Sequence, residues 1–171
     1  RHLFDSSITP EGLVDYVESI IQSNYICYYL KGGVGTVSTE ILSFLADEYT
    51  MKGYGVELYH QPLNPDRLQT LVVEGLKVGI TINPKTEMKA YKIIDLDSII
   101  DEDKFKDKAE LLQKDAETYL RMLEEGVRRI KMAKLIHDDL EKKYVTCMNF
   151  EAVTELRNRT VERIKGILRN K

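Results

Sequence analysis

Cysteine is scarce in this sequence, and its placement excludes two classes of protein. The only cysteines among the 171 residues are Cys27 and Cys147, which lie far apart and form no C-x-x-C spacing. Disulfide-stapled scaffolds and zinc sites need several cysteines at short, regular spacings. We therefore exclude both classes and expect the chain to fold in a reducing compartment.

Neither sign of charge is in large excess. The formal net charge is -3, so the whole chain offers no electrostatic reason to bind nucleic acid. One basic bias lies near the end of the sequence, and we interpret it as a solvated helix face. Its members are Arg157, Arg159, Arg163, Lys165, Arg169 and Lys171. The sequence predicts no nucleic-acid partner.

Long apolar runs are also missing. None is long enough to cross a bilayer, and no signal segment opens the chain. We expect a protein that is not bound to a membrane and is located in the cytoplasm. The first residue is Arg1 rather than Met, which suggests a piece of a longer protein.

The hydrophobic content, 43%, is sufficient for one sizeable core. Apolar runs predict strands over residues 25–30, 56–59, 71–73, 78–82 and 93–96, and a helix over residues 38–52. Strand, helix and strand in this order predict an α/β fold with a mainly parallel sheet of four or five strands. We expect this core to occupy residues 1–100 and a helical region to occupy residues 101–171.

Prolines guide two further expectations. Thr9, Pro10 and Glu11 resemble the start of a helix, with proline at the first helical position. Pro62 and Pro65 argue against a central strand over residues 60–66, because proline cannot donate a hydrogen bond to a neighbouring strand. We expect a loop there.

Apolar or small residues recur at alternating steps of four and three along the last third of the chain. This heptad spacing predicts a long helix that packs lengthwise against a partner. Asn149 then caps a second helix, so we expect an antiparallel helical hairpin with Leu123, Ile130 and His137 inside it. The heptad positions are Phe105, Ala109, Leu112, Ala116, Tyr119, Leu123, Gly126, Ile130, Ala133, His137, Leu140 and Tyr144.

A glycine-rich segment separates the first core strand from the helix that follows it. Backbone amides in such a segment, together with the positive end of the helix, form a common phosphate-binding arrangement. The segment aligns with the Walker A pattern G-x-x-x-x-G-K-[ST], but Val37 replaces the second glycine and Ser38 replaces the lysine. A plain turn between a strand and a helix is the alternative. The candidate binding residues are Gly32, Gly33, Val34, Gly35, Thr36, Val37, Ser38 and Thr39.

Magnesium chemistry at such a loop needs a carboxylate at the end of another strand. Asn83 occupies that place after the strand over residues 78–82, and an amide cannot neutralise a divalent cation. Asp95 and Asp97 are alternative acids, although helix caps or solvated turns are the more common roles for acids at strand ends. The sequence identifies neither catalytic residues nor metal ligands.

Two histidines offer weaker candidates. His60 and Asp66 could form a metal site or an acid-base pair, but a polar loop is the preferred interpretation. His137 lies in the heptad pattern, where we expect a packing role.

These residues give the chain a resemblance to one half, the second, of a bacterial family of P-loop ATPase-like proteins with two related P-loop halves in tandem. The resemblance implies a P-loop NTPase-like fold, ATP with magnesium as ligand, and a related P-loop domain in the same parent chain as partner. Family members show G-x-x-G-T-G-K-S-T at the loop and an Asp-Gly-Thr motif after the later strand, and this sequence departs at both places. The matching segments are residues 1–4, 8–12, 30–39, 60–66 and 133–141.

Three functions remain as hypotheses. The first is a degenerate nucleotide-binding domain with weak or absent hydrolysis. The second is an active ATP or GTP hydrolase in which Thr39 acts with Lys31 or Lys85 in place of the missing lysine. The third is an assembly module, such as a homo-oligomer, that uses the helical hairpin as its partner surface.

Overall fold

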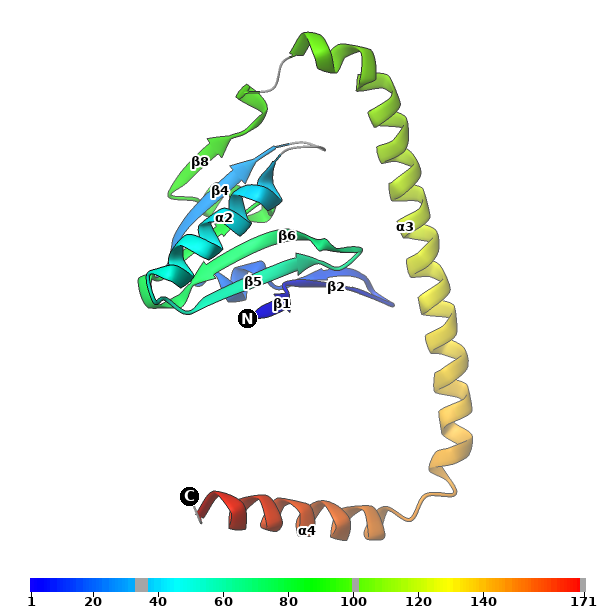
Figure 1. Ribbon diagram of the computed structural model, residues 1–171. Helices are drawn as coiled ribbons and strands as arrows, with labels where there is room; N and C mark the ends of the chain where they lie inside the picture. Colours follow the sequence, from blue (N-terminus) through cyan, green and yellow to red (C-terminus); the bar gives the residue numbers. More distant parts are fainter. Residues whose placement is uncertain (33–36, 100–101, 170–171) are drawn as a thin grey trace. The chain divides into compact units, whose positions relative to one another are not determined.

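The computed structural model describes residues 1–32, 37–99 and 102–169 of an α/β protein (Figure 1). The chain divides into two structural units, Arg1–Ile130 and Lys131–Lys171, and the boundary falls inside one long helix. Among the described residues, none of the helices combines the length and the apolar composition that a bilayer crossing requires.

The main sheet of the first unit is mixed and has six strands in the order β1-β5-β6-β7-β4-β8. Strand β6 is antiparallel to β5 and β7, and every other neighbouring pair is parallel. Five strands therefore point in one direction, as expected of a mainly parallel sheet, and β6 opposes them. The strands are β1 (His2–Phe4), β4 (Ile26–Lys31), β5 (Val56–Gln61), β6 (Asn64–Val73), β7 (Val78–Thr81) and β8 (Lys92–Asp95).

Side-chain alternation along β6 gives the sheet two covered faces. Leu71 and Val73 point into a cluster with Leu42 and Ala46 of α2 (Ser38–Met51), while Val72 packs in a second cluster with Val17 of α1 (Val17–Ile20). Gly79 permits a close approach on the second face. A Cβ there would lie 2.7 Å from side-chain atoms of Ile21.

The sequence predicted a helix that begins at Pro10, and this prediction is wrong. Residues Ser6–Thr9 form β2 and Gly12–Asp15 form β3, an antiparallel pair, and α1 occupies only the four residues that follow Tyr16. Thr9 Oγ1 accepts from Glu11 N at 3.2 Å and donates to Gly12 O at 2.9 Å, which closes the turn. Gly12 has φ of +113°, a conformation that ends any helix and that glycine adopts at little cost.

The loop expected over residues 60–66 is also wrong in part. Strand β5 continues to Gln61, and the ten-residue β6 begins at Asn64 and lies in the middle of the sheet. Proline is accommodated because the β5–β6 register shifts on both sides of His60, and β7 pairs only with residues 70–73 of β6. Pro65 therefore lies outside the regular part of the ladder, where its missing N–H breaks no pairing.

Most other core elements confirm the expected pattern. Helix α2 and strands β4, β5 and β8 lie within two residues of their predicted bounds, and residues 71–73 pair antiparallel with β7 as a short strand pair. In the described part of the chain, three short 3-10 helices complete the core. They are η1 (Glu74–Leu76), η2 (Pro84–Lys89) and η3 (Asp97–Ile99).

Two C-terminal helices are present among the described residues, as expected, and their packing as an antiparallel hairpin stays a prediction. Helix α3 (Glu102–Val145) is followed by α4 (Phe150–Arg169), and Asn149 Oδ1 accepts from Ala152 N at 3.0 Å, which confirms the predicted cap. Every side chain of α4 is exposed, Ile130 is 40% exposed and Leu123 is only half-buried. A heptad pattern shows that a helix needs a partner without specifying which partner.

Candidate functional site

The glycine-rich junction lies at the carboxyl end of β4. Strand β4 is paired in parallel with β7 on one side and β8 on the other, and its chain continues through α2 to β5 (Figure 1). The strands that follow β4 in the chain therefore lie on both sides of it. Strands β5, β6 and β7 lie on one side, and β8 lies on the other. In open α/β sheets, ligands commonly bind outside the carboxyl ends of the strands at such a point.

The structure describes four of the eight predicted binding residues. Gly33, Val34, Gly35 and Thr36 lie outside the described residues. Gly32 is exposed immediately after β4, Val37 is the N-cap of α2, and Ser38 and Thr39 are the first two residues of that helix. The described members are thus at the edge of the sheet where the sequence predicted a phosphate loop.

Val37 and Ser38 occupy the positions of the glycine and the lysine of the Walker A pattern. Val37 precedes α2 with φ of -77° and ψ of 29°, so its backbone lies outside the left-handed region that favours glycine. Ser38, the next residue in the chain, is buried, with 4% of its surface exposed.

The Thr39 hydroxyl, predicted to correspond to the Walker A hydroxyl, contacts the sheet. Thr39 Oγ1 accepts a hydrogen bond from Leu68 N at 3.3 Å, which ties the first turn of α2 to β6. This contact satisfies one of the backbone donors of β6 beyond its ladder with β7.

Asn83 follows β7, the parallel neighbour of β4, where a catalytic acid would be expected. Its buried amide bridges two other groups: Nδ2 donates to Asp15 Oδ2, and Oδ1 accepts from Lys85 N at 3.0 Å. The second bond caps η2. Asn83 therefore orders the connection between β7 and β8.

Asp95 and Asp97 lie beside the other neighbour of β4. Asp95 Oδ1 accepts from Asp97 N at 3.0 Å and from Ser98 N at 3.3 Å, so this carboxylate caps η3. Asp95 also forms an ion pair with Lys31 at 3.7 Å. Both side chains are nearly half exposed, so the pair contributes little to stability. The sequence allowed either a cap or a magnesium ligand at Asp95, and the structure shows the cap.

A buried carboxylate that sequence reasoning missed lies at the end of β1. Asp5 is 0% exposed, and its oxygens accept from Thr70 Oγ1 at 2.7 Å, Gln69 Nε2 at 2.9 Å and Ser6 Oγ at 3.1 Å. Burial raises the pKa of Asp5, and hydrogen bonds from Thr70 and Ser6 oppose that rise.

The network continues across the sheet to the neighbourhood of β4. Thr70 Oγ1 lies 2.8 Å from Thr81 Oγ1, which in turn accepts from Asn83 N at 3.0 Å. Asp15 joins through Asn83 and lies 3.9 Å from Lys85 Nζ. A pocket lies beside this network, and its lining includes Ser6, Asp15, Gln69, Asn83 and Lys85. Lys85, one of the two lysines considered as substitutes, thus pairs with Asp15.

One signal could have revealed Asp5. It follows a short strand directly, Asn83 comes two residues after β7, and Asp95 is the last residue of β8. Polar residues at parallel strand ends share one edge of a sheet. His2–Phe4 is only three residues long, however, and its pairing with β5 spans more than fifty residues of sequence.

Replacing Asp5 with Asn is expected to change how stability depends on pH. Because folding raises this pKa, the parent gains most stability below the ordinary aspartate value of about 3.9, and the gain disappears as pH rises through the raised pKa. The neutral Asn lacks this dependence. The unfolding free energy of the parent minus that of the variant should therefore fall as pH rises.

Urea denaturation at several pH values between about 4 and 7 measures this difference. Asp47→Asn is the matched control, because it makes the same chemical change on an exposed face of α2. A difference that rises with pH, or that Asp47→Asn reproduces, would contradict the assigned effect of burial.

The two histidine candidates have different environments from those expected. His60 Nε2 lies 2.8 Å from His2 Nδ1, their rings stack with centroids 5.1 Å apart, and His60 Nδ1 contacts Pro65 O. Both ring nitrogens of His60 thus have contacts other than Asp66. The structure does not bring His60 and Asp66 together as a pair.

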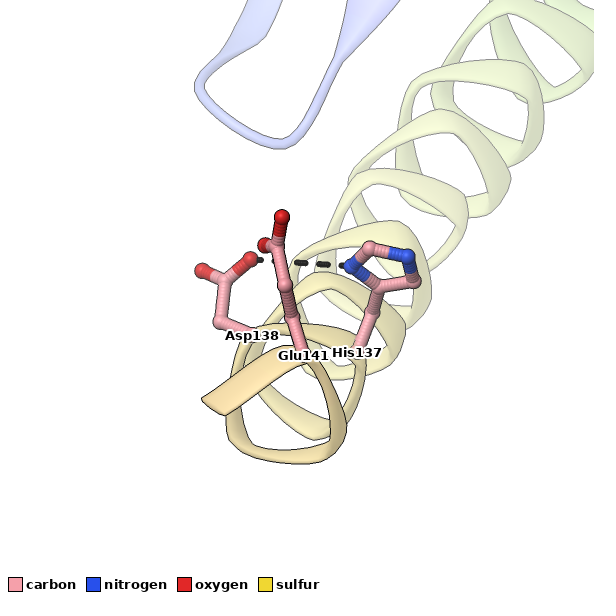
Figure 2. A group of neighbouring side chains, drawn as sticks. All are labelled: His137, Asp138 and Glu141. Carbon is pink, nitrogen blue, oxygen red and sulfur yellow. Dashed lines mark ion pairs between the residues drawn. The ribbon is translucent and has the colours of Figure 1, made fainter. Parts of the chain in front are cut away.

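His137 is exposed instead of packed. On α3 it shares a cluster with Asp138 and Glu141, whose potential ligand atoms all lie within 4.8 Å of one another (Figure 2). His137 Nδ1 is 3.9 Å from Asp138 Oδ1, and Lys134 Nζ donates to Asp138 at 2.7 Å. The bond from Lys134 lowers the pKa of Asp138. Since Lys134 already pairs with this half-buried carboxylate, we assign the cluster no metal role.

His137→Leu is expected to change the free energy of unfolding by no more than about 0.5 kcal/mol, because the side chain is 72% exposed. Chemical denaturation followed by far-UV circular dichroism measures the change. A loss above about 1 kcal/mol would show that the imidazole makes a stabilising contact that an exposed residue should lack.

Comparisons with protein-family models, with curated proteins and with solved structures found no match to this chain.

Proposed function

We propose that the β4–α2 junction binds the phosphate groups of a nucleotide and that the domain hydrolyses the nucleotide weakly or not at all. The observation that carries this proposal is the position of the glycine-rich segment. It lies between the carboxyl end of β4 and the first turn of α2, with parallel strands on both sides of β4. Backbone amides at such a helix start attract anions.

Weak hydrolysis follows from the side chains around this junction. Ser38 and Asn83 are uncharged, Thr39 bonds to β6, and Asp95 caps η3. Asn83 takes the place of the metal-binding carboxylate that would follow β7, and Ser38 takes the place of the lysine that would reach the phosphates. The proposed ligand is ATP with magnesium, bound mainly through backbone groups.

Calorimetric titration with magnesium ATP and with pyrophosphate, alongside a phosphate-release assay, tests this function. We expect weak binding without turnover. A dissociation constant in the low micromolar range with clear turnover would instead support the hydrolase, which was the second hypothesis.

Gly32→Glu locates the binding. A new carboxylate beside β4 should repel the phosphates and reduce affinity at least about tenfold. Gly55→Glu adds the same charge just before β5, at the opposite edge of the sheet, where a new Cβ meets nothing within 4 Å. Equal effects of the two variants would show that binding, if present, occurs elsewhere.

A further inference from the structure

The pocket beside the buried polar network lies at the edge of the sheet where β7 ends, and its volume is about 320 Å³. This volume is large enough for a small molecule. Part of the lining is apolar, and two of its members, Leu13 of β3 and Leu63 of the β5–β6 turn, are 54% and 49% exposed. Burying such side chains under an apolar group of a ligand is favourable, because it removes their surface from water.

Asp15 supplies a fixed negative charge to this pocket. Its side chain is only 8% exposed, and two donors hold the carboxylate in place. Oδ1 accepts from Val17 N at 2.9 Å, and Oδ2 accepts from Asn83 Nδ2. A carboxylate offers about four acceptor positions, so Asp15 can also accept from a ligand. A buried carboxylate is most stable beside a cation that donates hydrogen bonds to it.

Lys85 adds a positive charge to the same lining. Its Nζ lies 3.9 Å from Asp15 Oδ2, which is beyond hydrogen-bond distance, and its side chain is 58% exposed. The lysine can therefore turn away when a ligand provides a closer cation for Asp15. Such a ligand needs an anionic group as well, which Lys85 then binds.

We propose that this pocket binds a free α-amino acid with an apolar side chain. Its ammonium group donates to Asp15, its carboxylate accepts from Lys85, and its side chain packs against Leu13 and Leu63. An α-amino acid carries both charged groups on one carbon, so it matches two opposite charges that lie close together. Charge-assisted bonds at both groups fix its orientation. This site does not depend on nucleotide binding at the β4–α2 junction.

Two other kinds of ligand match the pocket less well. A simple amine pairs with Asp15 but offers no anion to Lys85. A phosphate compound pairs with Lys85 but brings its negative charges beside the buried carboxylate of Asp15, which repels them.

Calorimetric titration of the full chain with L-leucine tests the proposal. Two analogues are 3-methylbutylamine, which lacks the carboxylate, and 4-methylpentanoate, which lacks the ammonium group. We expect leucine to bind and each analogue to bind at least about tenfold more weakly, because each loses one charge-assisted bond. Absence of leucine binding up to about 10 mM, or equally tight binding of 4-methylpentanoate, would overturn the proposal.

Lys85→Met removes the positive charge and keeps most of the side chain. It should weaken leucine binding at least about tenfold without weakening 3-methylbutylamine. Lys89→Met is the matched control, because Lys89 lies on the same η2, donates to Glu18 and lines a different pocket. Equal effects of the two variants would contradict the proposed site.

Asp15→Asn tests the other end of the ligand and should weaken leucine and 3-methylbutylamine together, each at least about tenfold. Lys85→Met keeps the proposal testable if this buried change unfolds the chain. Loss of pyrophosphate binding in Lys85→Met, with leucine binding unchanged, would assign Lys85 to a phosphate site instead.

Discussion

Replacing Leu42 with Ala is expected to lower the free energy of unfolding by about 2–5 kcal/mol. Leu42 lies on α2, is 0% exposed and packs in the cluster that joins this helix to Leu71 and Val73 of β6. The loss combines the transfer of apolar atoms to water with the cavity that close-packed neighbours cannot fill.

Phe44→Ala is the matched comparison. Phe44 lies two residues further along α2 and is 65% exposed, so we expect a change within about 0.5 kcal/mol. Both variants introduce alanine into the same helix, so differences in helix propensity contribute little to the comparison. Urea denaturation measures both, and a loss from Phe44→Ala as large as that from Leu42→Ala would contradict the assigned face of α2.

The double change Val37→Gly with Ser38→Lys is expected to increase affinity for ATP or pyrophosphate about 10- to 100-fold. One charge-assisted hydrogen bond from the introduced lysine contributes about 1.5–3 kcal/mol. Val37 has a negative φ of -77°, so its replacement by glycine relieves no left-handed strain. The glycine instead allows the left-handed conformations that valine disfavours, which lets the segment close around an anion.

The two effects should be coupled, because the lysine can reach the phosphates only when the segment encloses them. Ser38 is buried, so Ser38→Lys alone is expected to bring little gain. A double-mutant cycle by calorimetric titration separates the coupling from the single effects. If no variant binds better than the parent, residues 32–39 form only a turn between a strand and a helix, and the proposed nucleotide function is incorrect.

Local sequence patterns were sufficient for several elements. Apolar runs predicted β4 and β5, helical spacing predicted α2, and Asn149 predicted the start of α4. These features depend on residues close together in the chain, such as the hydrogen bond from Ala152 N to Asn149 Oδ1. Helix periodicity and capping act within a few residues, so a sequence pattern contains most of the information.

Local patterns were misleading where a distant contact decided the outcome. Thr9, Pro10 and Glu11 match a helix start, but Asp5 accepts from Gln69 and Thr70 and thereby holds the first residues against β6. Pro65 argued against a central strand, yet its part of β6 extends beyond the pairing with β7. Neither arrangement is visible without knowing which strands are neighbours.

By itself, the sequence determined the α/β pattern, the glycine-rich junction after β4 and the amphipathic character of α3 and α4, because each depends on periodicity or on residue type within one segment. The tertiary structure alone decided that β6 runs against the other five strands, that Asp5 is buried beside Gln69 and Thr70, and that α4 is exposed. Strand order and burial arise from contacts between residues far apart in the chain, and one segment's hydrophobic period cannot specify its neighbour.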